Sequence, residues 1–191
     1  MKGFAEQHQF KKRKEINKLT EPSKEQIINQ AFKFHLQGNI SEAVKYYQYC
    51  LKQEFNDPAI FSNYGIILNS LGKKQEAEIL LRKAIKLNPN FADAYSNLGR
   101  ILKDLGKSEE AEILLRKAIE LNPNFANAYH NLGTILIDQG KKQEAEILLR
   151  KAIELNPNLV EAYSNVGSML IDQGKLEEAE ILLRKAIEIN P

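Results

Sequence analysis

The sequence repeats itself every 34 residues, and this period constrains the fold more than any other feature. The segment EAEILLRKAIKLNPNF at 76–91 returns three times, each copy beginning 34 residues after the last. The segments before these copies each begin with an aromatic residue and also align, and a looser copy starts upstream at Ile27. The chain is therefore predicted to hold a leader and five units, at 1–23, 24–57, 58–91, 92–125, 126–159 and 160–191.

Each unit reads as two amphipathic helices. In unit 92–125, apolar residues from Tyr95 to Leu105 keep the three-to-four spacing of one helical face. Gly106 can take the left-handed conformation that follows a helix end, and Asn122 stops the second helix because it precedes a proline. No segment alternates with a period of two, so the sequence predicts an all-α solenoid.

Small residues recur where the two helices of a unit would meet. Counted from the first residue of each unit, place 20 is always alanine. A glycine within a helix costs roughly 0.8–1.0 kcal/mol relative to alanine, so its recurrence at one place requires a compensating contact. We expect the two helix axes to approach closely at place 8, which holds Ala31, Gly65, Gly99, Gly133 and Gly167.

The pattern resembles the tetratricopeptide repeat, which has an aromatic at place 4, Leu-Gly at 7–8, Ala at 20 and Pro at 32. The resemblance covers 24–191, and four units carry nearly the full signature. The first unit departs from it, with Ile27 at place 4, Gln30-Ala31 at places 7–8 and Phe55 at place 32. It implies a right-handed superhelical solenoid of antiparallel helix pairs. Such arrays bind peptides or proteins in a groove lined by the first helix of each unit and catalyse nothing themselves.

In the family, places 2, 5, 6, 9, 12 and 13 face this groove. An asparagine amide both donates and accepts hydrogen bonds, so it can pair with the main chain of an extended peptide. A row of asparagines at place 6 is similar to the ladder in the repeat superhelix of O-linked N-acetylglucosamine transferase. The alternative is that these amides bond neighbouring helices. The predicted ladder is Asn29, Asn63, Asn97, Asn131 and Asn165.

The other groove places vary between units, whereas the second helices are nearly copies. Variation confined to one wall indicates a surface that reads ligand sequence, although recent duplication with drift gives the same pattern. These places hold six acidic residues and two basic residues. The excess of negative charge favours a polar or basic peptide and argues against nucleic acid in the groove. The further candidate contacts are Asp93, Arg100, Asp104, His130, Asp138 and Asp172.

The carboxylate clamp of chaperone-binding tetratricopeptide domains is missing. That clamp places Lys or Arg at places 5 and 2 and at place 6 of a later unit. The binding of chaperone tails is therefore not expected, since the corresponding positions hold Ile28, Asn29, Ala59, Ser62, Asp93 and Asn97.

The sequence shows no arrangement typical of an enzyme. Cys50 stands where the other units have alanine, so we expect a buried core thiol. Three dispersed histidines predict neither a metal site nor a catalytic site, and we expect no cofactor. No apolar run approaches the ~18 residues of a spanning helix or resembles a secretory signal, which predicts a cytoplasmic protein.

Both ends raise separate expectations. Residues 1–20 carry a net charge of +4 and the remainder −2, so the basic character belongs to a leader that we expect to be flexible. At the other end, helix 178–189 lacks a polar cap and should expose Ile181, Leu182 and Ile187. The alternative function is therefore a substrate-recruiting or assembly module of a larger bacterial transferase-type protein, self-associating through this end.

Overall fold

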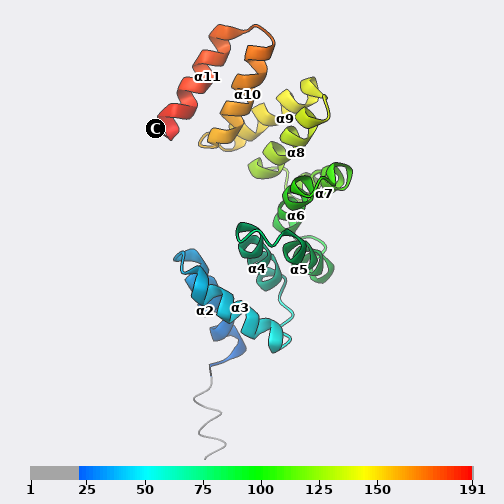
Figure 1. Ribbon diagram of the computed structural model, residues 1–191, viewed down its shortest axis with the longest axis vertical. Coiled ribbons are helices and arrows are strands. Elements are labelled where there is room, and N and C mark those ends of the chain that lie inside the picture. Colours follow the sequence, from blue (N-terminus) through cyan, green and yellow to red (C-terminus); the bar gives the residue numbers. More distant parts are fainter. Residues whose placement is uncertain (1–21, 191) are drawn as a thin grey trace, which may run out of the picture. The chain divides into compact units, whose positions relative to one another are not determined.

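The computed structural model describes residues 22–190 (Figure 1). Most of the basic leader, whose flexibility was predicted from sequence, lies outside this range. The described residues form ten α-helices and no strand, which confirms the predicted all-α solenoid of helix pairs. The helices are α2 (Lys24–Leu36), α3 (Ile40–Lys52), α4 (Pro58–Ser70), α5 (Lys74–Leu87), α6 (Ala92–Asp104), α7 (Ser108–Leu121), α8 (Ala126–Asp138), α9 (Lys142–Leu155), α10 (Val160–Asp172) and α11 (Leu176–Ile189).

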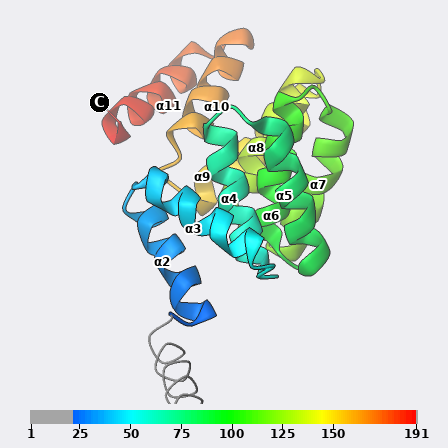
Figure 2. The same ribbon diagram turned by 60° about the horizontal axis from the view of Figure 1, so that its bottom comes forward.

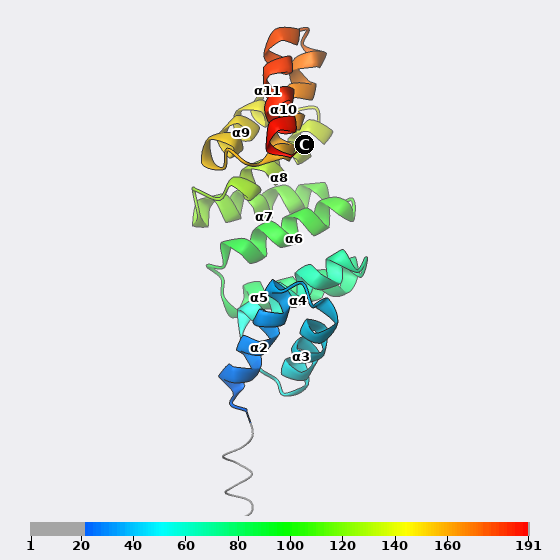
Figure 3. The ribbon, with the colours of Figure 1, turned by 90° about the vertical axis from the view of Figure 1, so that its left-hand side faces the viewer.

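The chain divides into a smaller unit that ends at Asn56 and a larger unit that begins at Asp57. In the larger unit, α4–α5, α6–α7, α8–α9 and α10–α11 form antiparallel pairs (Figure 2). The second helix of each pair packs against the first helix of the next, which builds one continuous array (Figure 3).

Helix ends follow the residues that the sequence singled out. Gly106 has a φ of +75°, and the N–H of Lys107 donates to the carbonyl of Leu102 at 2.8 Å, which satisfies a carbonyl at the end of α6. At the end of α7, Asn122 is extended, with φ −139° and ψ 91°, before its proline. Both expectations are confirmed.

The two helices of each pair approach closely at the place 8 glycine. A Cβ atom built on Gly99 would lie 2.7 Å from Cγ of Leu115 and 3.3 Å from the carbonyl oxygen of Ala111. Gly133 has the same relation to Leu149, also at 2.7 Å. The predicted close contact is confirmed, and it explains why glycine is retained within a helix.

First and second helices are spaced differently along the array. The first helices α4, α6, α8 and α10 contact one another in succession. The second helices α5, α7, α9 and α11 make no comparable contact with each other anywhere in residues 57–190. The first helices therefore form the shorter, inner side of the larger unit.

Ion pairs join the second helices on the outer side. Arg116 on α7 bonds Glu112 on its own helix at 2.8 Å and Glu144 on α9 at 2.7 Å. Lys141, at the start of α9, lies 3.4 Å from the same Glu112. The hydrogen bond from Arg116, followed by those from Gln139 and Lys141, lowers the pKa of Glu112, although partial burial acts in the opposite direction.

The smaller unit has an aromatic core of its own. Tyr47 and Cys50 on α3 are fully buried, the latter as predicted for a core thiol. The Tyr47 hydroxyl lies 3.2 Å from Nδ1 of His35 on α2, and burial lowers the pKa of this histidine. Ser23 begins α2 with a capping box, in which its hydroxyl accepts from the N–H of Gln26.

Replacing Gly99 with alanine tests the close contact between α6 and α7. Alanine favours the helix by about 1 kcal/mol, but its Cβ would overlap Leu115, and such overpacking costs about 1–3 kcal/mol. We expect Gly99→Ala to lower the free energy of unfolding, measured by urea titration of the circular dichroism signal. Gly65→Ala is the matched control. Its Cβ would lie 3.1 Å from Leu81, farther than the 2.7 Å between the Cβ of Gly99→Ala and Leu115, so the loss of stability should be smaller. Equal effects at the two glycines would contradict this account.

The outer ion pairs predict a pH-dependent stability. Because the pKa of Glu112 is lower in the folded state, its contribution is complete above the unfolded value of about 4.5 and is lost as pH falls through the folded value. The free energy of unfolding of Glu112→Gln should be about 1 kcal/mol below that of the unmodified chain near neutral pH. The two should converge once the pH has fallen below the folded pKa of Glu112. The control Glu120→Gln changes a glutamate that is 68% exposed and should matter little at any pH. A constant difference across the titration would refute the assignment.

Candidate peptide-binding surface

One exposed face of the first helices carries most of the candidate contact residues. Places 2, 6, 9 and 13 are separated by four, three and four residues, so they share one helical face. We call these residues of the larger unit the first-helix stripe, and none of them is buried. The stripe comprises Ala59, Asn63, Ile66 and Ser70 on α4; Asp93, Asn97, Arg100 and Asp104 on α6; Asn127, Asn131, Thr134 and Asp138 on α8; and Glu161, Asn165, Ser168 and Asp172 on α10.

The place 6 asparagines differ in what they contact. Within residues 22–190, the side chains of Asn63 and Asn97 make no hydrogen bond to the protein, and both are half-buried. The amide nitrogen of Asn165 lies 3.1 Å from Nε2 of His130 on the preceding first helix. Asn29 is exposed on α2 of the smaller unit. A bond between neighbouring first helices thus occurs at Asn165, whereas Asn63 and Asn97 keep their amides available.

Three of the candidate acids take part in ion pairs. Each is the last residue of its first helix, and each meets a lysine of the preceding repeat. The acidic excess that the sequence indicated along this surface is therefore partly compensated by lysines that lie outside the stripe, two of them on second helices. The pairs are Lys74–Asp104 at 3.2 Å, Lys103–Asp138 at 3.1 Å and Lys142–Asp172 at 3.0 Å.

The remaining charged residues of the stripe have no ion-pair partner within the described part of the larger unit. Asp93 and Glu161 are exposed near the starts of α6 and α10, and Arg100 is half-buried in the middle of α6. The stripe therefore presents two separate negative charges and one positive charge that no ion pair of the described larger unit neutralises.

His130 bonds the asparagine of the row that stands on the next first helix. It lies half-buried on α8, and its Nε2 lies 3.1 Å from the amide nitrogen of Asn165 on α10. Burial lowers the pKa of His130 below its usual 6.5, the charge of Glu161 acts to raise it, and Lys103 acts to lower it. The imidazole is therefore neutral at neutral pH, with one ring nitrogen available as an acceptor.

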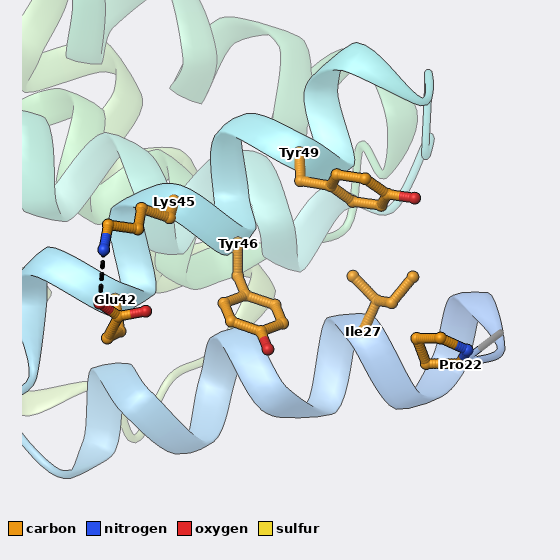
Figure 4. Close-up of a pocket in the computed structure, with 6 residues that line it drawn as sticks. All are labelled: Pro22, Ile27, Glu42, Lys45, Tyr46 and Tyr49. Carbon is orange, nitrogen blue, oxygen red and sulfur yellow. Dashed lines mark hydrogen bonds and ion pairs between the residues drawn. The ribbon is translucent and has the colours of Figure 1, made fainter. Parts of the chain in front are cut away.

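The smaller unit contains a pocket that the sequence did not predict. A recess of about 380 Å³ lies between α2 and α3, where the rings of Tyr46 and Tyr49 flank Ile27 (Figure 4). Glu42 and Lys45 close one side with an ion pair of 2.6 Å. The available signal was that these tyrosines replace the leucine and lysine of the other repeats.

A second recess, of about 480 Å³ and lined mainly by apolar residues, lies on the face of α11 that corresponds to the faces of α7 and α9 covered by the next repeat. We call this surface the end face of α11. Ile187 is 65% exposed, whereas Ile119 and Ile153 at the same place are half-buried under the next repeat. The expectation that Ile181 marks an end surface needs correction, because Ile147 at the equivalent place is 68% exposed in the middle of the array. Leu182 is half-buried.

Within residues 22–190, no group of three or more histidine, cysteine or acidic residues is placed to bind a metal ion. In the same range, no helix is long and apolar enough to cross a lipid bilayer.

Sequence comparison identifies the repeats directly. The family model described as "Tetratricopeptide repeat" matches residues 91–158 and 126–191, and a second model described as "TPR repeat" matches residues 65–106. The first model alone therefore spans more than half of the chain. No curated protein matches the sequence.

Solved structures with the same architecture include MamA, which is 27% identical, with a TM-score of 0.69 over 83% of this chain and 93% of that protein. YrrB, described as a TPR protein with an unusual peptide-binding site, is 25% identical, with a TM-score of 0.67 over 94% of this chain and 92% of its own. PilF of Pseudomonas aeruginosa, at 18% identity and a TM-score of 0.77 over 86% of this chain and 75% of its own, shares the fold.

The 34-residue period, the glycine contact within each pair and the stacking of successive pairs agree with these matches. Arrays of this type bind protein partners and are generally non-enzymatic, so the chain is a protein–protein interaction scaffold. It belongs to the tetratricopeptide repeat family.

Proposed function

We propose that the chain binds an extended peptide, or an extended segment of a partner protein, along the first-helix stripe. The observation that carries this proposal is the recurrence of asparagine at place 6 of α4, α6, α8 and α10, each of them only half-buried within the larger unit. The amides of Asn63 and Asn97 are not used within the described chain. Each could donate to a peptide carbonyl and accept from a peptide N–H.

The charges of the stripe would add selectivity to these main-chain contacts. Asp93 and Glu161 would attract basic side chains, and Arg100 would attract an acidic one, because none of the three is neutralised within the described array. The expected ligand is therefore polar, with basic residues near the two acids. The likeness to YrrB, whose description includes a peptide-binding site, supports a peptide as the class of ligand.

A double substitution tests the asparagine contacts. A peptide selected for binding to the unmodified chain, labelled with a fluorophore, would be titrated against Asn97→Ala/Asn131→Ala and followed by fluorescence anisotropy. Two lost hydrogen bonds of about 1 kcal/mol each predict roughly 30-fold weaker binding. The loss should be similar for selected peptides of different sequence, because the contacts are to the main chain.

The control is Asn124→Ala/Asn158→Ala, which changes two exposed turn residues outside the stripe and should leave affinity unchanged. Unchanged binding by Asn97→Ala/Asn131→Ala would show that peptides do not use the asparagine row.

Self-association through the end face of α11 is a second proposed function. Leu176 and Ile187 on this face are 64% and 65% exposed and border the 480 Å³ recess. An apolar surface of this kind favours contact with a second copy. The alternative of a recruiting module for a transferase-type protein rests on the sequence and stays a prediction.

Light scattering over a hundredfold range of concentration tests this second proposal. The unmodified chain should exceed the monomer mass of 21.8 kDa at high concentration, and Leu176→Gln/Ile187→Gln should return it to that mass. Ile147→Gln is the control, since Ile147 is equally exposed but lies in the middle of the outer side. A mass of 21.8 kDa for the unmodified chain throughout would rule out self-association by this face.

A further inference from the structure

A polar cluster joins two neighbouring first helices at one point of the stripe. His130 on α8 lies 3.1 Å, through Nε2, from the amide nitrogen of Asn165 on α10. The place 5 residue differs in the other repeats of the larger unit, where Ser62 and Ser96 are buried. Only at this point of the described array does a place 5 side chain bond the asparagine of the next repeat.

The protonation state of His130 decides which end of the Asn165 amide faces the stripe. The group that faces Nε2 is the Asn165 NH₂, which can only donate, so the neutral imidazole carries its proton on Nδ1 and accepts at Nε2. The carbonyl oxygen Oδ1 of Asn165 is then directed away from the imidazole and can accept a hydrogen bond from a ligand. Glu161 lies four residues earlier on the same face of α10, exposed and without an ion-pair partner among the described residues.

The charges around the cluster leave an excess of negative potential. Two charged side chains of neighbouring helices face His130, Glu161 from α10 and Lys103 from α6, and α7 and α9 contribute none that affects it. Lys103 is held by Asp138 at 3.1 Å, so its charge is balanced. The unbalanced group is the Glu161 carboxylate.

We propose that Glu161 and Asn165, with the amide oriented by His130, form a subsite for a lysine or arginine side chain of the bound peptide. The carboxylate would supply the charge, and the amide oxygen would accept a second hydrogen bond from the ammonium or guanidinium group. His130 acts as a positioning residue. This inference rests on the proposed binding of peptides along the stripe and names the side chain that one part of it selects.

The chain provides a natural comparison on α6. Asp93 and Asn97 occupy the same two places, but the residue that corresponds to His130 is the buried Ser62. The Asn97 amide is therefore not oriented by a neighbouring side chain. A cation at Asp93 would gain the charge contact without a fixed acceptor, so the selection of cations should be stronger at Glu161.

Acid should close the subsite. When His130 is protonated, Nε2 becomes a donor, and the Asn165 amide must turn its oxygen inward and present its NH₂ group to the ligand. The imidazolium also adds a positive charge beside the bound cation. The preference for a cationic side chain is therefore present above the pKa of His130, which burial holds below 6.5, and is lost as pH falls through that value.

The test uses the full chain, isotope-labelled for NMR, and three blocked pentapeptides of serine with a central lysine, glutamine or glutamate. Side-chain amide signals of Asn97, Asn131 and Asn165 report where each peptide binds. The ring signals of His130 are identified by their absence in His130→Ser and report its titration. At pH 7.5 the lysine peptide should shift the Asn165 signals and bind roughly tenfold more tightly than the glutamine peptide.

Variants separate the roles of the residues. Glu161→Gln should abolish the preference for lysine, and the matched control Asp93→Asn should retain it at Asn165. His130→Ser should weaken the preference and remove its dependence on pH between about 5 and 7.5. A preference that survives in Glu161→Gln, or that does not change as His130 titrates, would overturn the proposal.

The outcomes also distinguish this inference from the proposed function. If all three peptides shift the asparagine signals equally, the stripe binds peptides but the cationic subsite is wrong. If no peptide shifts any asparagine of the stripe at millimolar concentration, the proposed peptide binding fails and the subsite fails with it.

Discussion

The contact between the glycine at place 8 and the leucine at place 24 determines how each repeat is built. Because Gly99 has no side chain, α6 lies against α7 with Leu115 filling the space where a Cβ would stand. This contact fixes which face of the first helix is buried within the pair. Since the next repeat covers a further face, one face remains exposed, and it carries the residues of the stripe. The surface available for binding thus follows from the way the two helices pack.

The two sides of the larger unit are held by different forces. Neighbouring first helices contact one another directly, so a side chain such as His130 can bond a residue on the next helix. Neighbouring second helices are joined through long side chains such as Arg116, which reaches Glu144. Ion pairs of long side chains therefore join repeats on the outer side, whereas on the inner side Asp93, Arg100 and Glu161 have no ion-pair partner among the described residues.

Local features of the sequence predicted the fold well, because helix periodicity, Gly106 and Asn122-Pro123 act within a few residues of where they stand. The binding surface was predicted only as a set of positions within the repeat, without the contacts that their side chains make. Sequence did not reveal that Asp104, Asp138 and Asp172 meet lysines, because each pair spans about 30 residues and joins different repeats. The bond between His130 and Asn165 likewise depends on the stacking of two first helices. The pocket at Tyr46 and Tyr49 arises where the smaller unit departs from the repeat pattern.

The near-identity of the second helices has a consequence for folding. Gly99 and Gly133 meet their leucines at the same distance, so α6 would find in α9 almost the partner that it finds in α7. Packing energy alone hardly distinguishes these pairings. The short connection from α6 to α7 does so, because closing a loop of more than 30 residues instead costs roughly 2 kcal/mol more in chain entropy. The order of the helices is thus chosen by the turns, and Gly106, which permits a short turn, helps each helix to select its own neighbour among near copies.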